Sequence, residues 1–230
     1  KAQKKLRYFV ESSEITIGQK ATLMVEHFHE QVVSKNKIGG KARAMVVTSG
    51  IKRCIEYYYA INKCLANRRS PYKAIIAFSG VCEFRKGTTL TSAGLNGFPD
   101  NTIEKVFRTD PYRFLIVADM FQTGYDEPLL HTMYVDKTLS DIKAVQTLSR
   151  LNRSCPKKYD TFVLDFANKT SVIEEAFSNY YRTTILSSET DPNKLYDIIS
   201  IMDDYQIFSQ EHVETLVELY LNGAERDRLD

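Results

Sequence analysis

Two arginines follow a glutamine at regular spacing in the second half of the chain: Gln146, Arg150 and Arg153. Apolar residues recur every third position through this stretch, which predicts a helix over about 140–151 with one buried stripe. On such a helix Gln146 lies one turn before Arg150, and Arg153 lies beside Arg150 on the last turn. Two guanidinium groups held side by side suit a polyanion, most obviously a triphosphate. Arginines on helices are equally often simply solvated, so the pair alone leaves both interpretations open.

Length and composition limit the protein class. The 230 residues fit one large domain, or one domain with an appendage, and 43% hydrophobic residues can form a normal core. A net charge of +2 indicates no general polycation, so any nucleic-acid contact would be a local patch. The four cysteines show no C-x-x-C spacing, and His27 and His29 show no ligand spacing. We therefore predict neither a metal site nor a disulfide framework.

The sequence shows no signal peptide, and no apolar run approaches the ~18 residues of a membrane span. We expect a soluble, cytoplasmic protein with no membrane partner. The chain begins at Lys1 and ends in charged residues. We therefore expect a piece cut from something longer.

Short apolar runs alternate with helical patterns through the middle of the chain. This alternation predicts an α/β domain over 41–168, with a mostly parallel sheet covered by helices on both faces. A lead-in segment, 1–40, contains an amphipathic helix over 19–33, and the region from 169 to 230 contains helices only. Residues 87–97, rich in Gly, Thr and Ser, are predicted to form a loop. The predicted strands are 44–47, 74–78, 114–118, 132–135 and 161–165.

Polar residues follow two of the predicted strands, where open parallel sheets bind ligands. Thr48 and Ser49 come after the first strand, and the following helix start could hold a phosphate; either residue is equally well a helix N-cap. After the third strand, Thr123 supplies a hydroxyl and Gly124 permits close backbone approach. Asp126 could accept a hydrogen bond from a ribose hydroxyl or an arginine. A plain turn would have the same composition.

These motifs occur in a specific order. A strand, then Thr123-Gly124-Tyr125-Asp126-Glu127-Pro128, then a strand and the Gln146–Arg153 stretch resemble motifs V and VI of superfamily 2 helicases and translocases. Residues 44–49 resemble motif IV. The details most resemble the restriction (R, HsdR) subunit of type I restriction enzymes, over roughly residues 20–185. Ser149 departs from the commonest form, which has Gly, and the His-Arg pair of DEAD-box proteins is missing.

The resemblance implies a RecA-like, three-layer domain: the second motor lobe, followed by a helical extension. In such motors ATP and Mg²⁺ lie between two lobes, and the first lobe supplies the P-loop and the acidic metal-binding motif. Arg153 would then be the arginine finger and Arg150 a second γ-phosphate contact, with Gln146 ordering the site. Gly124 and Asp126 would complete the ATP-binding set.

The resemblance also implies partners. Thr48, Ser49 and Thr123 would contact the backbone of double-stranded DNA without reading its sequence. The first RecA-like domain and the nuclease domain would belong to the same parent chain, and the modification and specificity subunits to the same complex. The sequence contains no G-x-x-x-x-G-K-[ST] motif, so we expect no ATPase activity from this chain alone.

Two other functions stay open. One is the second lobe of another superfamily 2 helicase or remodeller; another is a non-catalytic RecA-like lobe that holds DNA or a partner. A small-molecule α/β enzyme would need a Gly-rich first turn or a nucleophile–base pair, and the sequence shows neither.

Pro99-Asp100 with Glu104-Lys105 resembles a nuclease motif, but its spacing is wrong and one element is incomplete. We predict no DNA cleavage by this chain.

Overall fold

The central element is a five-stranded sheet in the order β2-β5-β1-β6-β7, in which all neighbours are parallel. The computed structural model describes residues 14–85, 87–120, 125–186 and 210–221. Each strand coincides with a predicted apolar run to within two residues at either end, and the predicted α/β class with a parallel sheet is confirmed. The strands are β1 (Arg43–Thr48), β2 (Lys73–Ala77), β5 (Tyr112–Val117), β6 (Leu130–Asp136) and β7 (Phe162–Asp165).

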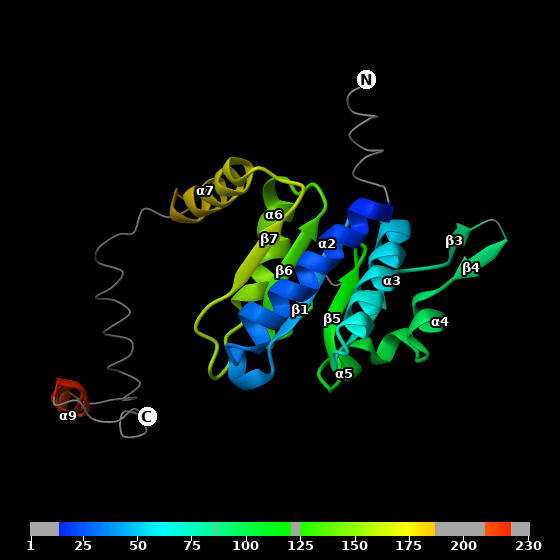
Figure 1. Ribbon diagram of the computed structural model, residues 1–230. Coiled ribbons are helices and arrows are strands. Elements are labelled where there is room, and N and C mark those ends of the chain that lie inside the picture. The colour runs from blue at the N-terminus through cyan, green and yellow to red at the C-terminus, as the bar shows by residue number, and fades with distance from the viewer. Residues whose placement is uncertain (1–13, 86, 121–124, 187–209, 222–230) are drawn as a thin grey trace. The chain divides into compact units, whose positions relative to one another are not determined.

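Helices cover both faces of the sheet, which gives the three layers of the predicted RecA-like fold (Figure 1). All six positions of β1 are buried, because the strand is central and covered on both sides. Successive side chains of a strand point to opposite faces. Val46 accordingly packs in one core with α2 (Glu14–His27) and α3 (Ile51–Asn67), whereas Val47 packs in the other with α5 (Ile103–Phe107) and α6 (Asp141–Leu148).

The first described helix starts earlier than expected. We predicted a helix over 19–33, but α2 begins at Glu14 and continues after His27 as a π-helical turn, η1 (Phe28–Val33). The hydroxyl of Tyr134 in β6 donates to the carbonyl of Met24 at 2.9 Å, which ties α2 to the sheet. The chain divides into two compact units, 1–180 and 181–230, so α2 shares a unit with the sheet. The functional boundaries near 40 and 168 stay predictions.

The segment predicted as a loop over 87–97 is instead partly regular, so that prediction is wrong. An antiparallel hairpin of β3 (Cys82–Arg85) and β4 (Thr88–Leu90) is followed by α4 (Ser92–Asn96). Figure 1 shows the hairpin extending away from the main sheet. Strands this short and polar carry no apolar alternation to reveal them. Thr91 caps α4 by accepting from the Gly94 amide at 3.0 Å.

The remaining elements follow the prediction where the structure describes them. A turn at η2 (Lys37–Gly40) precedes β1, and η3 (Asp100–Thr102) leads into α5. After the sheet come α7 (Thr170–Leu186) and α9 (Gln210–Leu221). The helix predicted near 195–201 lies outside the described residues. Of the helices in the described ranges, none is both long and apolar enough to cross a membrane.

Candidate functional site

The two arginines lie just beyond the helix that was predicted to carry them. The α-helix α6 ends at Leu148, and a tighter turn, η4 (Ser149–Asn152), contains Arg150. Arg153 follows with an extended backbone, φ −79° and ψ 121°, so its predicted place on the last helical turn is wrong. Helices commonly tighten at their ends, and the chain here must leave α6 to reach β7.

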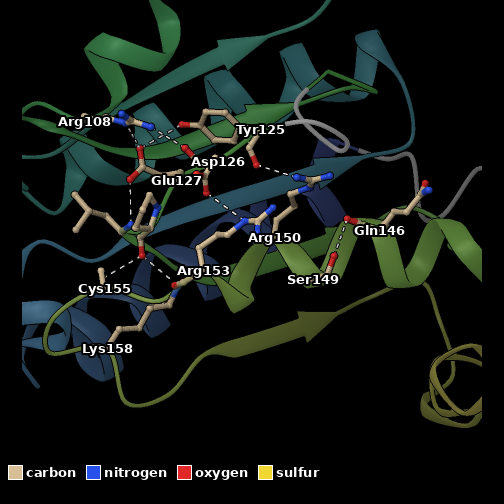
Figure 2. A network of polar contacts seen from close by, with 12 residues as sticks. Arg108, Tyr125, Asp126, Glu127, Gln146, Ser149, Arg150, Arg153, Cys155 and Lys158 are labelled. Atoms are coloured by element: carbon tan, nitrogen blue, oxygen red, sulfur yellow. Dashed lines mark hydrogen bonds and ion pairs between the residues drawn. The ribbon is translucent and has the colours of Figure 1, made fainter. Parts of the chain in front are cut away.

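One short segment brings both guanidinium groups together (Figure 2). Arg150 donates from Nη1 to the carbonyl of Tyr125 at 3.0 Å, and Arg153 Nε lies 3.2 Å from Asp126 Oδ1. The Arg153 and Asp126 side chains are 50% and 68% exposed. Such exposed ion pairs contribute little to stability and exchange partners readily. The predicted link between Asp126 and an arginine is therefore present, and it leaves Arg153 accessible to a ligand.

Gln146 stands apart from the pair. Its position on α6 is exposed, and its carbonyl accepts from the Ser149 hydroxyl at 3.3 Å. Figure 2 shows the Gln146 side chain extending away from both guanidinium groups. Its predicted role in ordering the site stays a prediction.

A buried carboxylate supports the segment that holds the arginines. The Glu127 side chain is 1% exposed, and its Oε2 lies 3.0 Å from Arg108 Nε. Its Oε1 accepts from the Leu129 amide at 3.0 Å, and Arg108 Nη2 donates to the Asp126 carbonyl at 2.7 Å. Hydrogen bonding to the Glu127 carboxylate raises the pKa of Arg108. Burial, reinforced by the Glu127 charge, raises the pKa of Tyr125, so its phenol stays protonated.

This cluster lies at the amino ends of the strands, not at the carboxyl ends where we expected the ligand site. Leu130, the first residue of β6, pairs with Arg43, the first residue of β1, and Asp126 lies just before it. Because β5 and β6 are parallel, the connecting segment must return along the sheet before β6 begins. The buried Tyr125 ring packs in the core that contains Val47, α5 and α6.

Two of the predicted DNA contacts, Thr48 and Ser49, lie at the carboxyl end of β1, the opposite end of the sheet from the arginines. Thr48 ends β1 fully buried, and its hydroxyl is directed to the carbonyls of Val117 at 3.0 Å and Gly50 at 3.3 Å. Ser49 is exposed. A backbone phosphate contact at this end of β1 stays a prediction. Thr123 and Gly124 lie outside the described residues.

The buried His131 and the half-buried His27 lie near the amino ends of the strands, and their pKa values are lowered. His131 is 3% exposed and bonds Thr132 Oγ1 at 2.8 Å and Asp160 Oδ1 at 3.2 Å. His27 bonds the Tyr134 hydroxyl at 2.9 Å. Burial lowers the pKa of both, and for His27 the nearby His131 lowers it further.

Within the described ranges, no group of three or more His, Cys, Asp or Glu side chains is placed to hold a metal ion.

We expect the free energy of unfolding to fall as the pH drops from about 7 to about 5. Below pH ~6.5, the pKa of a histidine in the unfolded chain, the unfolded chain binds more protons than the folded chain, because the pKa values of both histidines are lowered by folding. The limiting slope is about 1.4 kcal/mol per pH unit for each histidine. Urea unfolding at stepped pH values measures it. His131→Gln should flatten the slope, and His212→Gln, an exposed position on α9, should not. Equal slopes in all three proteins would contradict the assignment.

A parallel sheet between two helical layers, with two arginines at the amino ends of its strands, fits the predicted RecA-like α/β lobe. Residues 83–168 match the family described as type I restriction enzyme subunit R domain 3. MjaVIIP of Methanocaldococcus jannaschii, named as a type I restriction enzyme endonuclease subunit, is 23% identical over 97% of this chain and 22% of its own length. The type I restriction enzyme HindI endonuclease subunit of Haemophilus influenzae is 31% identical over 36% of this chain and 8% of its own length.

Among solved structures, the helicase domain of Pyrococcus furiosus Hef is 14% identical with a TM-score of 0.42, over 77% of this chain and 32% of that one. The sequence comparisons confirm the predicted resemblance: the chain is similar in sequence to type I restriction enzyme subunits. It spans about a fifth of the MjaVIIP relative, 22% of its length.

Proposed function

We propose that this chain is part of the DNA-translocating restriction subunit of a type I restriction–modification system. In that subunit it is the second motor lobe and supplies Arg150 and Arg153 in trans to ATP bound on the first lobe. The observation that carries the proposal is the anchoring of both guanidinium groups on Tyr125 and Asp126, with Arg153 half exposed. A solvated arginine pair would need no such common support.

The Asp126 carboxylate holds Arg153 until a stronger anion replaces it. A γ-phosphate competes for the same guanidinium, and phosphate–arginine pairs are strong, charge-assisted contacts. Arg153 then neutralises charge that develops on the transferring phosphoryl group, a contribution of ~10³–10⁵ in kcat for an arginine finger. Arg150, fixed on the Tyr125 carbonyl, adds a second γ-phosphate contact, and Gln146 orders the site. ATP and Mg²⁺ are held mainly by residues of the first lobe.

In this proposal the carboxyl ends of the strands face the DNA. Ser49 and the first amides of α3 contact the backbone of double-stranded DNA, with Thr48 supporting the turn from within. Thr123 and Gly124 couple this edge to the arginine site. The nuclease domain lies in the same parent chain, and the modification and specificity subunits complete the complex. The second candidate, another superfamily 2 motor, has neither of the two sequence relatives described above in its favour, since both are named as type I restriction subunits.

The isolated 230-residue chain should not hydrolyse ATP, because its sequence contains no P-loop motif. Phosphate release, with and without duplex DNA, measures this directly. The same chain carrying Arg153→Ala controls for contaminating ATPases, which the change leaves unaffected. ATP turnover by the wild-type chain that disappears in the Arg153→Ala protein would contradict the half-motor proposal.

A further inference from the structure

Lys158 connects the arginine to the segment on which it rests. Its ammonium Nζ donates to the carbonyl of Arg153 at 2.8 Å and to the carbonyl of Pro128 at 3.1 Å (Figure 2). The Cys155 thiol donates to the same Pro128 carbonyl at 3.3 Å. Lys158 is half-buried, and burial lowers its pKa. These two acceptors are main-chain carbonyls, so the side chain is placed to fix backbone positions.

Arg153 needs such a support. It follows the last tight turn with an extended backbone, and the chain forms no helix or strand again before Phe162. Its carbonyl therefore lies outside any helical or sheet hydrogen-bond ladder. Pro128 comes two residues after Asp126, the partner of the Arg153 guanidinium. Lys158 thus links the main chain of Arg153 to the segment before β6, and the same segment contains Asp126, the partner of the Arg153 side chain.

We propose that Lys158 is a positioning residue for Arg153. Its ammonium bridges the Arg153 and Pro128 carbonyls, and this keeps the Arg153 guanidinium within hydrogen-bonding distance of Asp126 and of the γ-phosphate. This inference rests on the proposed function of Arg153. Lys158 itself contacts no nucleotide. Small displacements of a catalytic group are costly, since a misplacement of ~1 Å can lower a rate ~10²-fold. Loss of Lys158 should therefore act on turnover through Arg153.

A double-mutant cycle in the full parent chain tests this coupling. The four proteins are wild type, Lys158→Met, Arg153→Ala and the double variant, and the readouts are kcat and KM for DNA-stimulated ATP hydrolysis. We expect Lys158→Met to lower kcat ~10–100-fold, with KM for ATP changed less than ~3-fold. In the Arg153→Ala background the same change should lower kcat less than ~2-fold, because the group it positions is gone.

Two further variants sharpen the cycle. Lys157→Met removes an exposed neighbouring lysine and should leave kcat unchanged. Lys158→Arg keeps a charged donor and should recover part of the lost turnover. If the Met variant does not fold, Lys158→Gln takes its place in the cycle. Equal losses of kcat in both backgrounds would overturn the inference and make Lys158 a general loop support. An Arg153→Ala change without effect would contradict the proposed function itself.

Discussion

Replacing Arg153 by alanine in the full parent chain should lower kcat for DNA-stimulated ATP hydrolysis by ~10³-fold or more. The guanidinium is half exposed and pairs with an exposed carboxylate, so its removal should leave folding and DNA binding intact. Arg150→Ala should also lower kcat, but it additionally removes a bond to the Tyr125 carbonyl and should loosen the segment. Steady-state phosphate release at saturating DNA measures both effects.

The matched control is Arg68→Ala, which removes an exposed arginine just after α3 and should leave turnover unchanged. Arg153→Lys separates charge from geometry, because lysine keeps the charge and loses the planar fork of donors. Turnover unaffected by both Arg153→Ala and Arg150→Ala would make the arginines structural. The chain would then be better described as a lobe that binds DNA or a partner.

Replacing Glu127 by alanine should destabilise the domain by about 1–3 kcal/mol. The carboxylate is buried, and its loss removes the acceptor of the Leu129 amide and the carboxylate partner of Arg108. The Tyr125–Asp126 segment, which holds both site arginines, loses its support at the same time. Urea unfolding of the isolated chain measures the change in stability, and the same substitution in the parent chain should also lower kcat.

Two variants separate these effects. Glu127→Gln keeps an oxygen acceptor for the Leu129 amide and should lose less stability than the alanine variant. Glu174→Ala removes an exposed carboxylate from α7 and should stay within about 0.5 kcal/mol of wild type. An alanine variant at Glu127 as stable as this control would mean that the buried carboxylate does not support the segment.

Most of the fold could be predicted because parallel strands covered on both faces are continuously apolar. Met45, Val46 and Val47 are buried whichever way they point, so the run is visible without an alternating pattern. The β3–β4 hairpin could not be found in this way. Its strands have three or four residues, mostly polar, and lie outside the main sheet.

The candidate site was only partly predictable. The order of Asp126, Arg150 and Arg153 along the chain carries a motif, and the structure brings these three residues together. Arg108 and Lys158 carry no such signal, because they come from separate segments that meet only after folding. Spacing placed Arg153 on a helix, although the helix ends five residues earlier, at Leu148.

The carboxyl-edge prediction shows a second limit. A hydroxyl at the end of a strand can face a ligand or satisfy a neighbouring strand, and one sequence does not distinguish these cases. Thr48 satisfies the Val117 carbonyl, whereas the adjacent Ser49 is exposed. Whether Asp126 lies at the amino or the carboxyl ends of the strands depends on the path of the segment before β6. No local sequence pattern predicts that path.

The most direct test of the central claim is a structure of the parent chain with duplex DNA, ADP and a γ-phosphate mimic. We predict that the Arg153 guanidinium lies within ~3 Å of the mimic, as a charge-assisted hydrogen bond requires, and that its pair with Asp126 is broken. Arg150 should lie on the same group. A complex in which Arg153 still pairs with Asp126, and neither Arg150 nor Arg153 touches the nucleotide, would contradict the account.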